Sequence, residues 1–268
     1  MRRGSKTFLS SFERLKRGSD VMAVGSQFFG LQGKTAIVTG GTRGIGRAMT
    51  ELFLECGATV IYTGVHPAPE QPISGARYEA LDLADKKSVE RLCSEVLGVL
   101  PRLDILVNNA GIQIRSALED IRDEDWHRLH TVHLTGPMEL MRAAAPRMRS
   151  GGWGRVVNIA SIWGVISKPT RTSYSAAKTG LIGLTRAAAL DLAPDGILVN
   201  AVAPGLVNTE MTAASLSPEE RRAIMLQIPL GRFADPQEIA RVVVSLCSPL
   251  NTIITGQTIV VDGGFTIQ

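Results

Sequence analysis

The sequence predicts one α/β domain, a doubly wound parallel sheet of the Rossmann-like type with helices on both faces. First, runs rich in β-branched residues alternate with stretches of helical periodicity from Gly33 onward. Second, the strand-like runs are apolar almost throughout, as are strands that are buried on both faces of a sheet. Third, no Pro-, Gly- or Ser-rich linker divides the alternating part of this 268-residue chain, which favours a single domain.

The first half of the predicted sheet comes from three strands and two helices. Lys34–Thr39 and Thr59–Thr63 are rich in β-branched and apolar residues, and Arg77–Leu81 is a weaker run of the same kind. Asp85–Leu97 is predicted as a helix. An earlier helix follows the first strand, because apolar residues recur there at helical spacing: Ile45, Met49, Leu52 and Phe53.

The second half continues the alternation. Leu103–Val107 and the β-branched run Arg155–Ile159 are predicted strands, separated by a long helix over Glu124–Met148. Ser173–Leu192, rich in Ala and Leu, is the next helix. The last elements are a strand over Leu198–Val202, a helix over Pro236–Ser245 with proline in its first turn, and a strand over Thr258–Val261.

The predicted domain spans residues 31–268 and is preceded by a basic extension over residues 1–30. Residues 1–20 hold six basic and two acidic side chains, which account for the whole formal net charge of +4. The domain itself is therefore neutral, and no nucleic-acid partner is predicted. The extension could be an organelle presequence, since Phe8, Leu9, Phe12 and Leu15 could share one helical face. We favour a dispensable tail that could be disordered, or a true start at Met22.

The cysteines indicate a reducing compartment. Cys56, Cys93 and Cys247 are few, odd in number and far apart, so no pair has the spacing of a metal or redox motif. We expect free thiols in a cytoplasmic protein. No apolar run has the length of a membrane span, so no membrane association is predicted.

A glycine-rich turn follows the first strand and opens the first helix, reading Thr39-Gly40-Gly41-Thr42-Arg43-Gly44-Ile45-Gly46. Glycine lets the backbone turn sharply and approach a pyrophosphate, which the free N–H groups and positive end of the helix can bind. The spacing is G-x-x-x-G-x-G instead of G-x-G-x-x-G, and an ordinary tight turn also uses glycine. Its place between a strand and a helix favours a dinucleotide site.

Five motifs in one order are similar to those of the short-chain dehydrogenase/reductase family. They are the turn T-G-x-x-x-G-x-G, Asn108-Asn109-Ala110-Gly111, Ser161, Tyr174-x-x-x-Lys178, and Pro204-Gly205 followed by Thr209. The resemblance covers residues 31–268 and includes the 3-oxoacyl-[acyl-carrier-protein] reductases and the sugar or polyol dehydrogenases. It implies an NAD(P)-dependent oxidoreductase that moves a hydride between nicotinamide and a ketone or secondary alcohol.

The candidate catalytic residues are Ser161, Tyr174 and Lys178. A free tyrosine has a pKa of about 10, which is poor for proton exchange near neutrality. Lys178 lies one helical turn after Tyr174, and a nearby cation should lower the pKa of the phenol, which then acts as general acid or base. Ser161 would hold the substrate oxygen beside that hydroxyl. The resemblance implies that Lys178 also binds the nicotinamide ribose.

His133 is a fourth candidate and a departure from the family pattern. It stands where the family usually has an asparagine that supports a water-linked proton path to the lysine. Histidine can donate, accept and titrate near neutrality, so it could replace the asparagine or impair the relay. His127, His130 and His133 lie three apart on one helix, but their series drifts around the axis, and no metal site is predicted.

NADP is the preferred cofactor, with NAD still open. Gly64 stands where NAD-preferring relatives carry an acid for the adenosine ribose, and Arg43 could pair with a 2′-phosphate. A solvated turn residue is the alternative for Arg43. By resemblance, the cofactor also contacts Gly40, Thr42, Gly44, Ile45, Gly46, Asp82, Leu83, Asn109, Ala110, Gly111, Pro204, Gly205, Val207 and Thr209.

The expected substrate is a small-molecule carbonyl compound or alcohol, with a sugar, a polyol or an acyl thioester all open. The stretch 208–232 corresponds to the family's substrate lid, and the side chains expected to face the pocket are Gln113, Arg115, Trp163, Met211, Ile224 and Met225. Arg115 could meet a carboxylate or phosphate, or face solvent. The resemblance implies a homotetramer. A nucleotide-binding regulatory or scaffold protein with little turnover is the competing interpretation.

Overall fold

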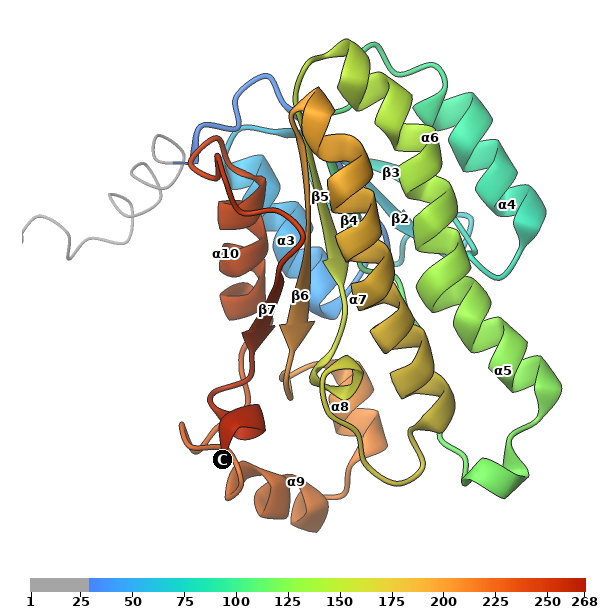
Figure 1. The fold of residues 1–268 in the computed structure, drawn as a ribbon, viewed down its shortest axis with the longest axis vertical. Coiled ribbons are helices and arrows are strands. Elements are labelled where there is room, and N and C mark those ends of the chain that lie inside the picture. Colours follow the sequence, from blue (N-terminus) through green and yellow to red (C-terminus); the bar gives the residue numbers. More distant parts are fainter. Residues whose placement is uncertain (1–28) are drawn as a thin grey trace, which may run out of the picture.

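The computed structural model describes residues 29–268 and confirms the predicted doubly wound sheet (Figure 1). All strand pairs are parallel, and the order is β3-β2-β1-β4-β5-β6-β7. The strands are β1 (Thr35–Val38), β2 (Thr59–Gly64), β3 (Arg77–Ala80), β4 (Ile105–Asn108), β5 (Gly154–Ile159), β6 (Ile197–Pro204) and β7 (Thr258–Val261). Each lies within three residues of its predicted place. The inner strands β1, β2, β4, β5 and β6 are largely buried, as their apolar runs predicted, whereas the edge strands β3 and β7 are half-buried or exposed.

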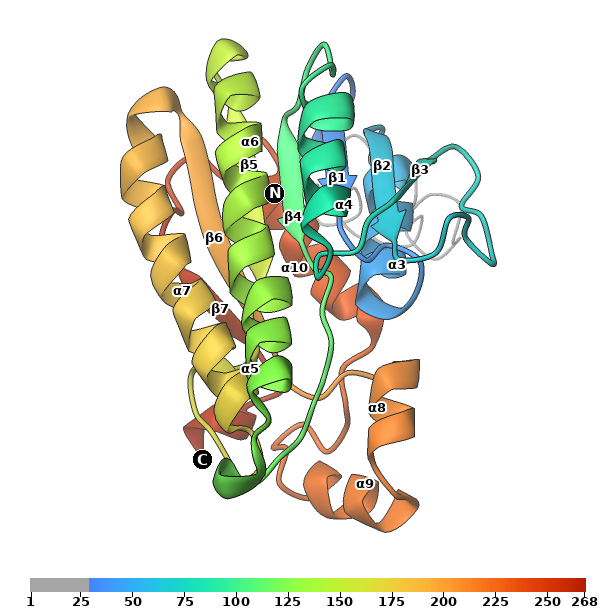
Figure 2. The ribbon, with the colours of Figure 1, turned by 90° about the vertical axis from the view of Figure 1, so that its right-hand side faces the viewer.

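Helices cover both faces of the sheet (Figure 2). One face carries α3 (Gly44–Glu55) and α10 (Pro236–Cys247), whose side chains share a hydrophobic cluster with β1, β4 and β5. The other face carries α4 (Lys86–Arg91), α6 (Gly136–Ser150) and α7 (Thr172–Leu192).

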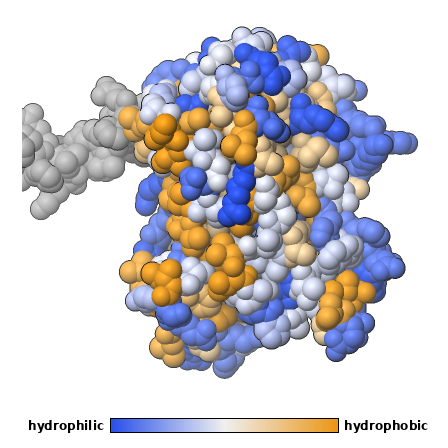
Figure 3. All heavy atoms as spheres, viewed as in Figure 1, coloured by the Kyte–Doolittle hydropathy of each residue, from blue (hydrophilic) through white to orange (hydrophobic). Residues whose placement is uncertain are grey.

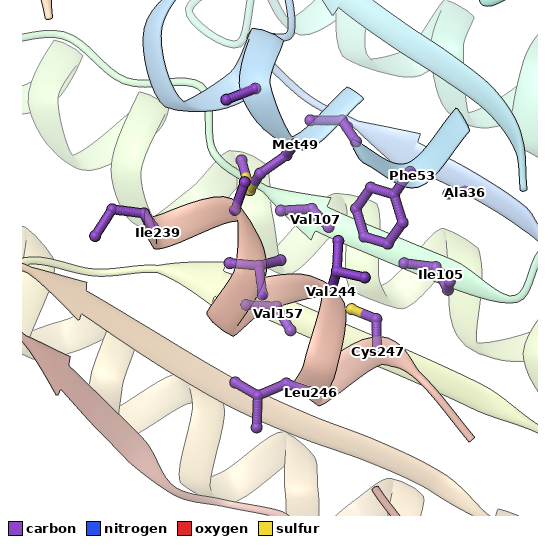
Figure 4. Close-up of a cluster of buried hydrophobic side chains, with 14 of the residues drawn as sticks. Ala36, Met49, Phe53, Ile105, Val107, Val157, Ile239, Val244, Leu246 and Cys247 are labelled. Atoms are coloured by element: carbon purple, nitrogen blue, oxygen red, sulfur yellow. The ribbon is translucent and has the colours of Figure 1, made fainter. Parts of the chain in front are cut away.

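The core consists of one cluster on each face, and the strands divide their side chains between the two. In β1, Ala36 and Val38 belong to the cluster under α3 and α10, while Ile37 belongs to the other cluster. This follows from the alternation of side chains along a strand. Figure 4 shows the first cluster, in which Met49 and Phe53 of α3 meet the apolar side chains of α10 above the sheet.

The predicted helix Glu124–Met148 is interrupted. It consists of α5 (Asp123–His130), a π-helical turn over Thr131–Thr135, and α6. Pro137 lies in the first turn of α6 and has no N–H to donate to the carbonyl of His133, four residues earlier. The π-helical turn therefore accommodates a missing hydrogen bond, and it holds His133. The predicted helix Asp85–Leu97 also changes, because α4 passes into a π-helical segment over Leu92–Leu97.

Two short helices within residues 208–232 were not predicted individually. They are α8 (Glu210–Ser215) and α9 (Pro218–Met225), and they stand beyond the carboxyl ends of the strands (Figure 2). The start of α9 has a recognisable signal. Ser217 and Glu220 form a reciprocal capping box, which the sequence Ser-Pro-Glu-Glu predicts.

The predicted extension lies almost wholly outside the described residues, and so do the apolar face at Phe8–Leu15 and Met22. Phe29, at the beginning of the described chain, is half-buried and packs against the cluster under α3 and α10.

Candidate active site

A single cavity at the carboxyl ends of the strands brings together the residues that the sequence singled out. Its volume is about 320 Å³. It is lined by all the predicted site residues: Gly40, Thr42, Arg43, Gly44, Ile45, Gly46, Asp82, Leu83, Asn109, Ala110, Gly111, His133, Ser161, Tyr174, Lys178, Pro204, Gly205, Val207 and Thr209. In an open parallel sheet this edge is where ligands bind.

The glycine turn between β1 and α3 requires glycine on steric grounds. Gly40 has a φ of +64°, and a Cβ on it would lie 2.8 Å from the Cα of Ala110. A Cβ on Gly46 would lie 2.0 Å from the carbonyl oxygen of Gly40. The N-cap residue Arg43 makes no side-chain capping bond, and no acidic residue occupies the first turn of α3. The positive end of the helix therefore remains available to an anion in the cavity.

Asn109 and Thr39 fix this turn to the end of β4. The side-chain amide of Asn109 donates to the carbonyl oxygens of Thr39 and Gly40 at 2.9 and 3.0 Å. The hydroxyl of Thr39 accepts from the backbone N–H groups of Asn109 and Ala110 at 2.9 and 3.0 Å. Thr39 was not predicted to have a role of its own, although it begins the glycine motif.

Ser161, Tyr174 and Lys178 meet on one wall of the cavity, where Ser161 and Lys178 are buried and Tyr174 is half-buried. Ser161 follows β5, where its hydroxyl accepts from the N–H of Trp163 at 3.2 Å and is hydrogen-bonded to Tyr174. Tyr174 and Lys178 lie one turn apart on α7, with the Lys178 ammonium 5.7 Å from the centroid of the Tyr174 ring. Lys178 Nζ donates to the carbonyl oxygen of Ile159 at 2.6 Å.

Burial has the largest effect on the protonation states of Tyr174 and Lys178. It raises the pKa of Tyr174, against smaller opposing effects of the Ser161 hydrogen bond and the Arg171 charge. It lowers the pKa of Lys178 from its ordinary 10.5 to about 7. In the protein alone the pKa of Tyr174 is therefore raised and not lowered as predicted, because loss of hydration outweighs the Ser161 hydrogen bond and the Arg171 charge. Tyr174 stays protonated at neutral pH, as a proton donor must.

His133 faces the same wall and is 2 % exposed. Its ring meets that of Tyr174 edge-on, with centroids 5.2 Å apart. Nε2 lies 2.7 Å from the carbonyl oxygen of Ile112 and 3.3 Å from its N–H, and the shorter contact indicates an Nε2–H donor. Burial, followed by the charge of Lys178, lowers the pKa of His133 well below 6.5, so the ring is neutral. Nδ1 is buried and has no partner among the described residues.

Gly111 makes room for that imidazole. A Cβ on Gly111 would lie 2.6 Å from Cε1 of His133. The departure from asparagine at position 133 and the glycine at 111 are thus sterically linked, a coupling that could not be read from the sequence.

The end of β2 has no space for an acidic side chain. A Cβ on Gly64 would lie 2.7 Å from Cγ2 of Thr42 and 3.0 Å from the hydroxyl of Tyr78. Arg43 is 68 % exposed at the side chain and forms an ion pair at 3.6 Å with Glu210 of α8. Arg43 also lines the cavity, so its guanidinium can reach an anion there.

The substrate side of the cavity holds Gln113, Arg115, Trp163, Met211 and Ile224, as the sequence analysis expected, whereas Met225 is not among its lining residues. Lys168 and Arg171 also line it and were missed. The only sequence signal was that both lie within a few residues before Tyr174. Within residues 29–268 no group of three His, Cys, Asp or Glu side chains is placed to hold a metal ion. No helix of that part of the chain is long and apolar enough to cross a membrane.

Comparison with known proteins agrees with this geometry. Residues 40–266 match the family model described as Enoyl-(Acyl carrier protein) reductase. FabG of Aquifex aeolicus, a 3-oxoacyl-[acyl-carrier-protein] reductase, is 41% identical over 243 residues, covering 87% of this chain and 98% of the relative. FabG of Escherichia coli is 39% identical over 238 residues, covering 87% and 97%.

The solved structures agree as well. A protein of Beutenbergia cavernae, provisionally assigned as an NAD(P)-dependent gluconate 5-dehydrogenase and solved with NADP at low occupancy, superimposes with a TM-score of 0.83 at 36% identity. The match covers 89% of this chain and 98% of that one. The chain therefore belongs to the short-chain dehydrogenase/reductase family and is an NAD(P)-dependent oxidoreductase that acts on a ketone or secondary alcohol.

Proposed function

We propose that the protein reduces a ketone with NADPH, Tyr174 giving the proton and Ser161 and Lys178 assisting it. The observation that carries this proposal is the meeting of these three side chains on one wall of the cavity, which the glycine turn also lines. The comparisons give no support to the alternative of a regulatory or scaffold protein with little turnover.

The residues of the cavity fit a dinucleotide. The turn at Gly40 and Gly46 leaves no room for side chains and offers backbone N–H groups at the positive end of α3, suited to a pyrophosphate. Asp82 and Leu83 would flank the adenine, and Asn109–Gly111 the ribose. The remaining predicted contacts lie at the ends of α3 and β6, at Thr42, Gly44, Ile45, Pro204, Gly205, Val207 and Thr209.

NADP is the form that the site favours, and NAD is the second candidate. A carboxylate that would select NAD cannot stand at Gly64 without displacing Thr42 and Tyr78. Arg43 offers a planar guanidinium to a 2′-phosphate, in exchange for its exposed ion pair with Glu210. The Beutenbergia cavernae structure contains NADP. When bound, the cofactor supplies the hydride that reduces the carbonyl carbon.

Ser161, Tyr174 and Lys178 have separate roles in proton transfer to the substrate oxygen. Ser161 donates a hydrogen bond to the substrate oxygen and holds it beside the phenol. Tyr174, kept protonated by burial, transfers its proton to that oxygen as negative charge develops on it. Lys178 has a pKa of about 7, so near neutrality it is a charged or neutral donor in almost equal amounts and can stabilise the phenolate that forms. His133 positions the backbone of Ile112 at the edge of the cavity.

A homotetramer and a cytoplasmic location are also proposed. Support for assembly comes from apolar side chains that gather on the face shown in Figure 3 and from the exposure of Ile253 and Ile267, before and after β7, which are 84% and 87% exposed. Surfaces of that kind commonly mark protein interfaces. Support for a reducing compartment comes from Cys56, Cys93 and Cys247, which are all free thiols.

Fluorescence titration of the purified protein with NADPH and NADH tests the cofactor proposal. We expect NADPH to bind more tightly, and Arg43→Ala to weaken NADPH by about tenfold while leaving NADH unchanged, since one charge-assisted contact is lost. Equal weakening of both cofactors would assign Arg43 a structural role. A preference for NADH would contradict the NADP assignment, and failure to bind either would contradict the proposed function.

A further inference from the structure

Three basic side chains gather at the substrate side of the cavity. Arg115 lies in the segment after β4, and Lys168 and Arg171 lie between β5 and α7. None of the three forms an ion pair within residues 29–268. No ion pair therefore neutralises these three charges within the cavity that holds Tyr174.

Arg171 is the buried member of the cluster. It is 4% exposed, and its Nε and Nη1 atoms are buried without any hydrogen-bond partner among the described residues. A guanidinium carries five donors in a fixed fork, and leaving them unpaired away from water is costly. A residue that served only to stabilise the fold would be expected to have these donors satisfied.

The surroundings of Arg171 disfavour a cation in other ways. Burial lowers its pKa, and the charge of Arg115 lowers it further. Burial and then the charges of Arg171 and Arg115 lower the pKa of Lys168, with a small opposing effect from Glu220. Arg171 also directly precedes α7, a 21-residue helix whose positive end repels cations and attracts anions. An anion bound there would offset the repulsion between these cations and would be attracted by the positive end of α7.

The backbone before Arg171 is strained as well. Thr170 has a φ of +64°, the one positive value for a non-glycine residue in the described chain. A β-branched residue rarely adopts this conformation, and such outliers persist where a neighbouring side chain has to be held in place. Thr170 directly precedes Arg171, so the strained residue adjoins a residue that lines the cavity.

The location of the Arg171 guanidinium distinguishes between two anions that it could bind, one on the substrate and one on the cofactor. Its Cζ atom is 6.0 Å from the ring centroid of Tyr174 and 6.0 Å from that of Trp163. Tyr174 and Ser161 are the groups that hold the reacting oxygen, so an anion on Arg171 lies a few bonds from the reacting carbon. Gly64 and Arg43, by contrast, stand near β2, three strand spacings or roughly 14 Å from β5. Arg171 is thus well removed from the candidate 2′-phosphate site.

We propose that the substrate is an oxo acid or hydroxy acid whose carboxylate binds Arg171, with Arg115 and Lys168 beside it. The inference rests on the proposed function, because it takes Tyr174 as the proton donor to the substrate oxygen. A planar carboxylate matches the guanidinium fork with two parallel hydrogen bonds. A neutral 3-oxoacyl thioester, the substrate class in the names of the FabG relatives, would leave the fork unpaired.

Matched substrate pairs test the proposal with NADPH oxidation as the readout. The pairs are acetoacetate with methyl acetoacetate and levulinate with methyl levulinate, in which a methyl ester replaces the negative carboxylate. We expect the wild-type protein to prefer the acid, and Arg171→Gln to lower kcat/KM for the acid by about 100-fold, the effect of removing one partner of a buried charge pair. The kcat/KM of Arg171→Gln for the ester should differ little from that of the wild type. Arg241→Gln, an exposed arginine of α10, is the control and should leave both unchanged.

Equal loss for acid and ester in Arg171→Gln would overturn the proposal and assign Arg171 a structural role. Dihydroxyacetone phosphate paired with dihydroxyacetone forms a second arm. A charge preference seen only in that pair would replace the carboxylate by a phosphate and overturn the assignment.

Thermal unfolding supplies a readout that does not depend on turnover. Without ligand, Arg171→Gln should melt at a higher temperature than the wild type, because an unpaired buried cation is removed. With NADP⁺ present, acetoacetate should raise the melting temperature of the wild type and not that of Arg171→Gln. If no ketone is reduced but this shift is seen, the proposed function fails while the carboxylate site stands. If ketones are reduced and the shift is absent, the carboxylate site is wrong.

Discussion

Replacement of Lys178 by methionine should make the protein more stable at neutral pH. The pKa of Lys178 falls from 10.5 to about 7 on folding because its ammonium loses its hydration. A difference of about 3.5 in pKa corresponds to about 5 kcal/mol, of which about 4 kcal/mol remains at pH 7. Methionine removes this penalty but leaves the carbonyl oxygen of Ile159 without its 2.6 Å partner. That loss costs about 1–3 kcal/mol, so the net gain should be about 1–3 kcal/mol.

The sign of the pH dependence follows from the same pKa. Between pH 7 and 10.5 the unfolded chain binds a proton at this lysine that the folded chain does not. Wild-type stability therefore rises with pH relative to Lys178→Met, by up to about 1.4 kcal/mol per pH unit. The advantage of the variant should shrink by about 2 kcal/mol between pH 7 and pH 9.

Urea unfolding followed by tryptophan fluorescence at pH 7, 8 and 9 measures these differences. Lys86→Met is the matched control, since the Lys86 side chain is 81% exposed and its replacement should have an effect that does not vary with pH. A difference between wild type and Lys178→Met that stays constant from pH 7 to 9 would refute the reasoning. It would show that Lys178 keeps an ordinary pKa despite its burial.

Two further predictions concern glycines that fit their neighbours closely. Gly111→Ala should destabilise the protein by about 1–3 kcal/mol because its Cβ meets the imidazole of His133, and His133→Asn should restore much of that loss. Urea unfolding of the four proteins of this double-mutant cycle measures the coupling, and strictly additive effects would contradict the contact. Gly64→Asp should weaken NADPH without creating tight NADH binding, because the new side chain displaces its neighbours. Fluorescence titration measures both affinities, and an NADH-selective variant would show that the acid fits.

Much of the fold could be predicted because its signals are local. The five inner strands are apolar runs that are largely buried, and α7 ends at Leu192 as its composition predicted. The π-helical turn at Thr131–Thr135 could not be predicted, because it depends on how Pro137 and the chain around it pack against the sheet. The two lid helices are short and weakly amphipathic, and only the capping box at Ser217 marks one of them.

The sequence predicted which residues line the candidate site, but it predicted their pKa values and burial less well. The motifs place every expected residue at one cavity because the carboxyl ends of parallel strands share an edge of the sheet. The pKa of Tyr174 depends on burial, which the four-residue spacing to Lys178 does not reveal. Arg171 was missed because an arginine before a helix is ordinarily exposed, and only the folded chain shows it buried and unpaired.

The central claim is that Tyr174 is the proton donor in a reduction by NADPH. Its most direct test is a single-turnover measurement on Tyr174→Phe, following NADPH absorbance after mixing with the ketone panel, alongside NADPH affinity by fluorescence. The account predicts that hydride transfer falls by at least about 100-fold, the usual contribution of a positioned acid, while NADPH affinity is unchanged. A variant that binds NADPH and transfers hydride at close to the wild-type rate would contradict it.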